Sequence, residues 1–156
     1  MKRMGIISLV WVFIDQVIKF IVVNNIKLYS HVKVIPNFFY IAHVRNNGAA
    51  WSILSGNRFL LIGIGVIAII LIYFFFIKDK NLIWYDIISY SLLFGGIIGN
   101  LIDRIVLGYV VDYFEFIFGN YTYPVFNFAD MCIVISIGLI IVKSIREDVC
   151  KKKKLK

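Results

Sequence analysis

Residues 59–77 read FLLIGIGVIAIILIYFFFI, nineteen consecutive positions without a charged side chain. As an α-helix this stretch is about 28 Å long, which is close to the roughly 30 Å hydrocarbon thickness of a bilayer. The surrounding chain has the same character, because 61% of its 156 residues are hydrophobic and its mean hydropathy is +0.87. Soluble domains are only about 45–50% apolar. The sequence therefore predicts a polytopic membrane protein with a single domain.

Three further apolar stretches are long enough to cross a bilayer. The first follows a short basic head and resembles the apolar region of a secretory signal peptide, but no small-residue cleavage site follows it, so we interpret it as a retained helix. The predicted fold class is an all-α membrane protein with a small β-rich, interfacial, extracytoplasmic segment between its first two helices. The predicted spans of this single integral domain (1–156) are about 4–23, 59–77, 84–102 and 126–142, followed by a basic cytoplasmic tail at 143–156.

The distribution of Lys and Arg predicts the orientation in the membrane. With four spans, both termini and the loop at 78–81 lie on one side, which then carries eleven of the 17 basic residues, seven of them in the tail. The other side carries six. By the positive-inside rule the termini are cytoplasmic, and the same rule explains the net charge of +8 without nucleic acid as a partner. The polar residues near positions 100–104, 112 and 130 then converge on the outer boundary.

The outer segment at 24–57 contains no run of membrane length. Residues 33–36 and 38–44 are typical of short strands separated by a turn at Pro36-Asn37. The segment ends in Asn46-Asn47-Gly48-Ala49-Ala50-Trp51. An ordinary turn before a helix is one interpretation, and a substrate-facing loop with close backbone approach is the one we favour. The aromatic side chains at 38–40 suggest that the segment lies at the membrane interface and covers a bound peptide.

Several ionisable residues lie inside the apolar stretches. Asp15 and Lys19 are spaced i,i+4 and can pair on one helix face, either to ease insertion or to brace a polar site. Gly95 and Gly99 have the spacing of close helix packing in lipid. They precede Asn100, Asp103 and Arg104, a polar cluster that glycine packing does not explain. Asp103 and Arg104 can also be interpreted as a boundary marker with a snorkelling Arg.

Asp112 and Asp130 are the best candidates for chemistry. Acids at membrane depth are costly and are functional hypotheses by default. Two carboxylates held close together share one proton near neutral pH, so one can activate a water while the other protonates a carbonyl oxygen. The alternative is that both merely cap helices. The only histidines, His31 and His43, lack ligand spacing, so we expect no metal and no cofactor.

The chain resembles lipoprotein signal peptidase (signal peptidase II) over nearly its whole length. The matching stretches are Asp15-Gln16-x-x-Lys19, Asn46-x-Gly48-Ala49-Ala50-Trp51, Gly95-Gly96-x-x-Gly99-Asn100-x-x-Asp103-Arg104, Val110-Val111-Asp112-Tyr113 and Phe126-Asn127-x-Ala129-Asp130. The resemblance implies a bacterial cytoplasmic-membrane aspartic endopeptidase whose active site lies near the outer leaflet. Such enzymes cut prolipoproteins before a cysteine that already carries diacylglycerol.

Carried over by position, the resemblance implies a role for each matching polar residue. Asp112 and Asp130 would be the catalytic pair. The substrate-binding or supporting residues would be Asp15, Lys19, Asn46, Gly48, Asn100, Asp103, Arg104 and Asn127. Membrane lipids and globomycin-type cyclic peptide inhibitors would be further partners, and the protein would be a monomer.

Two residues depart from the pattern of this family. Tyr113 stands where the family usually has Phe, and Met131 stands where it usually has a small hydroxyl residue. Two other classes of protein remain open at this point. A transporter or complex subunit would use the acids for ion passage or assembly. An intramembrane protease of the presenilin type would carry a Gly-x-Gly-Asp motif, which this sequence lacks.

Overall fold

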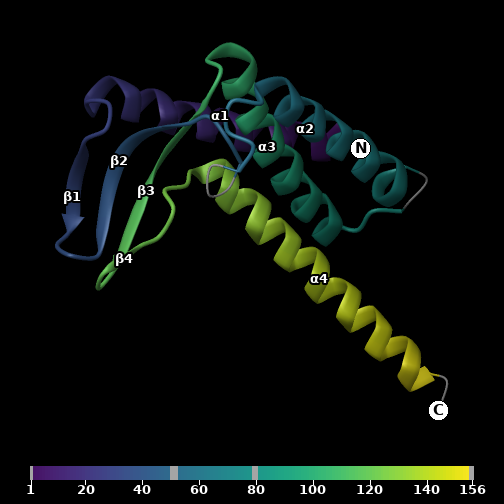
Figure 1. Cartoon of the computed structure of the whole chain (residues 1–156). Coiled ribbons are helices and arrows are strands. Elements are labelled where there is room, and N and C mark those ends of the chain that lie inside the picture. The colour runs from purple at the N-terminus through teal and green to yellow at the C-terminus, as the bar shows by residue number, and fades with distance from the viewer. Residues whose placement is uncertain (1, 50–52, 79–80, 155–156) are drawn as a thin grey trace.

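The structure, a computed structural model, describes residues 2–49, 53–78 and 81–154. Four of its helices are long and apolar enough to cross a membrane. They are α1 (Lys2–Asn25), α2 (Arg58–Ile72) with its π-helical continuation η2 (Tyr73–Ile77), α3 (Trp84–Val106) and α4 (Phe128–Lys154). Helix α4 begins two residues later than the predicted span, which starts at 126, and it continues through most of the basic tail. Its C-terminal part projects away from the other helices (Figure 1).

Helix α3 is the centre of the bundle, since it packs against α1, α2 and α4. Three glycines allow this close packing. A Cβ atom on Gly95 would lie 2.6 Å from the Cβ of Trp11 on α1, and one on Gly99 would lie 2.6 Å from Oδ2 of Asp15. A Cβ atom on Gly96 would overlap the carbonyl oxygen of Ala129 on α4. The predicted close-packing role of Gly95 and Gly99 is confirmed, and their partner is α1.

A four-stranded antiparallel sheet lies beside one end of the helices, where α1 and α3 end and α2 and α4 begin (Figure 1). Its strands, in spatial order, are β1 (His31–Ile35), β2 (Phe39–Asn46), β3 (Val110–Phe118) and β4 (Tyr121–Thr122). In the central pair, Val44 lies opposite Asp112 and Asn46 lies opposite Val110. This register brings the end of β2 to the start of β3.

The sheet corrects the sequence-based description of the fold. The predicted β-rich segment between the first two helices does contain two strands, but the sheet is completed by β3 and β4, which follow α3. Strand β3 begins just before Asp112 and β4 lies between Asp112 and Asp130, in a stretch for which the sequence predicts no strand. The pairing that defines β3 is between residues far apart in the chain, so no local pattern identifies it.

Candidate active site

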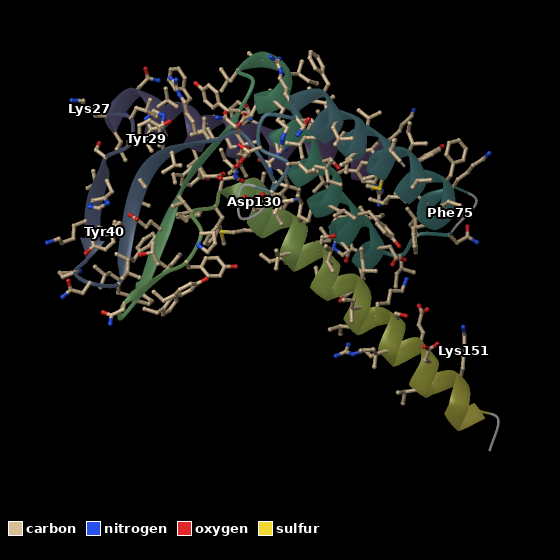
Figure 2. All side chains as sticks on the ribbon, in the orientation of Figure 1. Lys27, Tyr29, Tyr40, Phe75, Asp130 and Lys151 are labelled. Carbon is tan, nitrogen blue, oxygen red and sulfur yellow. The ribbon has the colours of Figure 1, made fainter. Side chains whose placement is uncertain are left out.

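Asp112 and Asp130 line one cavity although they come from different elements. Asp112 lies near the start of β3, where it is 2% exposed. Asp130 lies in the first turn of α4, and Figure 2 shows it where that helix begins, remote from the ends of the bundle marked by Phe75 and Lys151. The cavity has a volume of about 130 Å³. Its other lining residues are Asn46, Ala49, Asn100, Arg104, Val110, Tyr123, Pro124, Val125 and Phe126.

Each oxygen of the two carboxylates accepts a hydrogen bond. Asp112 accepts from Nδ2 of Asn127 at 2.7 Å and from Nδ2 of Asn46 at 2.9 Å. Asp130 accepts from Nδ2 of Asn100 at 2.8 Å and from the backbone N–H of Asn127 at 3.2 Å. In the described part of the chain the two acids are joined through Asn127 and not by a direct hydrogen bond.

Asp130 also takes part in capping α4. Asn127 is the residue before the helix, and its Oδ1 accepts from the backbone N–H of Asp130 at 3.0 Å while Asp130 accepts from the backbone N–H of Asn127. This is the reciprocal arrangement of a capping box. Capping is therefore one of the contacts of Asp130, whereas Asp112 lies in a strand and caps no helix.

The environment of Asp112 favours its protonated form. Burial raises the pKa of this carboxyl to about 7, and the nearby charge of Asp130 acts in the same direction. The hydrogen bonds from Asn46 and Asn127 and the charge of Lys19 oppose the shift. A carboxyl that titrates near neutrality beside a second carboxylate is suited to general acid–base chemistry.

A buried ionic cluster adjoins Asn100, which lines the cavity. Nζ of Lys19 is 2.8 Å from Oδ2 of Asp15 and 2.9 Å from Oδ2 of Asp103, and all three side chains are at most 4% exposed. Gln16 donates to Asp103 at 2.9 Å and to Asp15 at 3.2 Å. The predicted Asp15–Lys19 pairing is confirmed, and Asp103 joins this pair.

Two contacts connect this cluster to the strand and the helix that carry the acids. Oδ2 of Asp103 accepts from the backbone N–H of Val111, next to Asp112, at 3.0 Å. Oδ1 of Asp15 accepts from the backbone N–H of Ala129, next to Asp130, at 3.1 Å. The cluster therefore holds both chain segments at backbone positions next to the acids.

Arg104 and Asn46 hold the loop that follows β2. Arg104 donates to the carbonyl oxygen of Gly48 at 3.0 Å, and Oδ1 of Asn46 accepts from the backbone N–H of Gly48 at 2.9 Å. Arg104 also lines the cavity. The predicted small-residue loop is thus adjacent to the two acids as far as Ala49, whereas Ala50 and Trp51 lie outside the described residues.

Nine of the ten sequence-predicted site residues lie in this cavity, in the loop or in the ionic cluster, and the tenth, Asn127, binds both acids. Sequence reasoning missed three contributors: Gln16, the phenol of Tyr113 and the cavity wall at 123–126. Gln16 stands inside a quoted motif, so its position was a usable signal. Within the described residues, no group of three or more His, Cys, Asp or Glu side chains could hold a metal ion.

The fold and the site define a multi-pass membrane protein with two carboxylates in one cavity. The sequence model described as "Signal peptidase (SPase) II" matches residues 7–146. Lipoprotein signal peptidases of Staphylococcus aureus strains JH9 and Newman are each 40% identical over 149 residues, which cover 96% of this chain and 91% of the relative.

Two solved structures resemble this one closely. A "Bacterial membrane enzyme structure by the in meso method at 2.3 A resolution" superimposes with a TM-score of 0.85 at 38% identity, covering 95% of this chain and 90% of the other. A second with the same description at 1.9 Å has a TM-score of 0.80 at 39% identity and covers 92% of both chains. The chain belongs to the signal peptidase II family, a family of bacterial membrane peptidases.

Proposed function

We propose that this protein is an aspartic endopeptidase that removes signal peptides from prolipoproteins, and that Asp112 and Asp130 are its catalytic pair. The proposal rests on one observation: the two acids come from separate elements, line the same cavity and are joined through Asn127. Membership of the signal peptidase II family supports the substrate class. The bond cut is the one before the diacylglyceryl-modified cysteine.

The proposed reaction uses one proton shared by the pair. The unprotonated carboxylate takes a proton from a water, the water oxygen attacks the peptide carbonyl carbon, and the protonated carboxyl gives its proton to the carbonyl oxygen. Collapse of this tetrahedral intermediate breaks the C–N bond, and the leaving amine takes the proton that the pair received from the water. A hydroxyl of the intermediate gives its proton to the other carboxylate as the C=O bond re-forms, so the pair again holds one proton. The raised pKa of Asp112 supports this residue as the protonated member.

A neighbouring groove supports a substrate that carries an apolar chain. This groove has a volume of about 350 Å³ and shares Tyr123, Phe126 and Asp130 with the acid-lined cavity. Its remaining wall is formed by Met131, Val134 and Ile135 of α4, and Val134 is exposed. A lipid chain on the cysteine next to the scissile bond would lie in this groove without leaving the apolar layer. It would therefore avoid the cost of exposure to water, which is about 0.8 kcal/mol for each CH₂ group.

We further propose that both termini are cytoplasmic and that the acid pair lies near the outer leaflet of the bacterial cytoplasmic membrane. The charge distribution and the position of the sheet at one end of the helices support this orientation. In it, the segment at 24–57 lies at the membrane interface and covers the bound signal peptide. Globomycin-type cyclic peptides would occupy the same cavity, and the protein would act as a monomer.

The experiment that tests the function compares two substrates with the purified protein in detergent. One is a prolipoprotein whose cysteine carries diacylglycerol, and the other is the same protein with an unmodified cysteine. We expect cleavage of the modified substrate alone, with product masses that place the cut immediately before the cysteine. Equal cleavage of both substrates, or a cut elsewhere, would contradict the proposal.

A further inference from the structure

The first three backbone N–H groups of α4 are each satisfied by a different part of the chain. These groups have no partner inside a helix and must be satisfied from outside it. Asn127, which precedes the helix, accepts from Asp130, and Asp15 on α1 accepts from Ala129. The third contact is made by β3, because the phenol oxygen of Tyr113 accepts from the backbone N–H of Phe128 at 3.0 Å.

Tyr113 is unlike the other two partners because it is covalently adjacent to one of the acids. It follows Asp112 in β3, and the N–H that it binds belongs to a residue two positions before Asp130. A short path therefore runs from one acid through the Tyr113 ring and a single hydrogen bond to the helix that carries the other. The ring is only 1% exposed and packs with Val22 and Val111.

Burial keeps this phenol a stable hydrogen-bond partner. It raises the pKa of Tyr113 above its ordinary value, so the hydroxyl stays neutral throughout the range in which the enzyme would act. Replacing the phenol by a phenyl ring would keep the packing and leave the N–H of Phe128 without its present acceptor. The start of α4 would then be held to β3 through Asn127 and Phe126 but no longer through Phe128, which allows the helix to shift relative to the strand.

We propose that Tyr113 is a positioning residue, whose hydroxyl fixes the separation of Asp112 and Asp130 by tying the start of α4 to β3. The inference rests on the proposed function, because it concerns the geometry of the same catalytic pair. Tyr113 is a position at which this sequence departs from the Phe that is usual in its family, and the inference gives this side chain a role. The task is performed through the hydroxyl, which is the group that Phe lacks.

The test compares Tyr113→Phe with Tyr85→Phe in the purified full-length protein. Tyr85 is a matched control, because its hydroxyl also binds the backbone of α4, donating to the carbonyl oxygen of Leu139 at 2.8 Å, well away from Asp130. Both variants lose one phenol–backbone hydrogen bond and keep the ring. Steady-state cleavage of the diacylglyceryl-modified substrate is measured from pH 5 to 9, with thermal unfolding measured in the same detergent.

We expect Tyr113→Phe to lower kcat about threefold to tenfold with KM unchanged, and Tyr85→Phe to leave both constants as they are. The alkaline limb of the pH profile of Tyr113→Phe should also move to lower pH. Asp112 faces the charges of Asp130 on α4 and Lys19 on α1, and Arg104 of α3 lines the same cavity. The charge of Asp130 raises the pKa of Asp112, so a longer separation between the two acids lowers that pKa.

Three outcomes would overturn the inference. A Tyr113→Phe variant with the kcat and pH profile of the unaltered protein would overturn it alone, even if its unfolding temperature fell, since that is the result of a purely structural role. Equal losses of kcat in both variants would do the same. Failure of the unaltered protein to cleave the substrate would overturn the proposed function and this inference with it.

Discussion

Lys19 donates to Oδ1 of Asn100 across 3.1 Å, and this contact determines which end of the Asn100 amide meets Asp130. An ammonium group can only donate, so the amide must turn its oxygen toward Lys19. Its Nδ2 then points to Asp130, to which it donates at 2.8 Å. The buried cation thus acts on the cavity through Asn100 as well as through the two acids that it pairs.

Lys19→Met should strongly destabilise the protein. The variant leaves Asp15 and Asp103 buried without their cation, and breaking a buried ion pair costs about 3–5 kcal/mol. We expect a large decrease in unfolding temperature in detergent, with loss of cleavage. Lys27→Met removes an exposed lysine that follows α1 and serves as the control. Unfolding of the Lys19 variant at the same temperature as the control would contradict this account of the cluster.

Gly96→Ala should disturb both packing and activity. The added Cβ atom would overlap the carbonyl oxygen of Ala129, next to Asp130, so α3 and α4 would have to separate. Overpacking of this kind costs about 1–3 kcal/mol. The control is Gly138→Ala on α4, where an added Cβ atom meets nothing within 4 Å. Equal unfolding temperatures and equal cleavage rates for the two variants would show that the close approach of α3 and α4 is not required.

Asn46→Ala should change the pH dependence of cleavage in a definite direction. The hydrogen bond from Asn46 favours the charged form of Asp112 and lowers a pKa that burial has raised to about 7. Its removal raises that pKa, so Asp112 keeps its proton to higher pH and the alkaline limb of the profile moves upward. Initial rates from pH 5 to 9 measure the shift, with exposed Asn120→Ala as the control. An unchanged or lowered alkaline limb in the Asn46 variant would contradict the prediction.

The parts of the site that the sequence predicts are those with a local signal. Asp15 and Lys19 are one helical turn apart, and Gly95 and Gly99 share one helix face, so spacing alone is sufficient to predict their contacts. The two acids are conspicuous because each stands in an apolar stretch. Charge asymmetry predicts an orientation without any structure.

The parts that the sequence does not predict depend on contacts between distant segments. Asp15 accepts from Ala129, 114 positions away, and no periodicity connects two such residues. The extent of β3 cannot be predicted for a related reason: its partner strand β2 is separated from it in the sequence by α2 and α3. Tyr113 shows the same limit at shorter range, since a phenol that caps the next helix has the same sequence signal as one that only packs.

The central claim is that Asp112 and Asp130 together hydrolyse the peptide bond, and the most direct measurement is cleavage of a diacylglyceryl-modified prolipoprotein by three purified proteins. These are the unaltered protein, Asp112→Asn and Asp130→Asn, each shown to be folded by its thermal unfolding. We expect robust cleavage by the unaltered protein and none above background by either variant, because an amide can neither accept the water proton nor share one with its partner. Cleavage that survives either substitution would contradict the account.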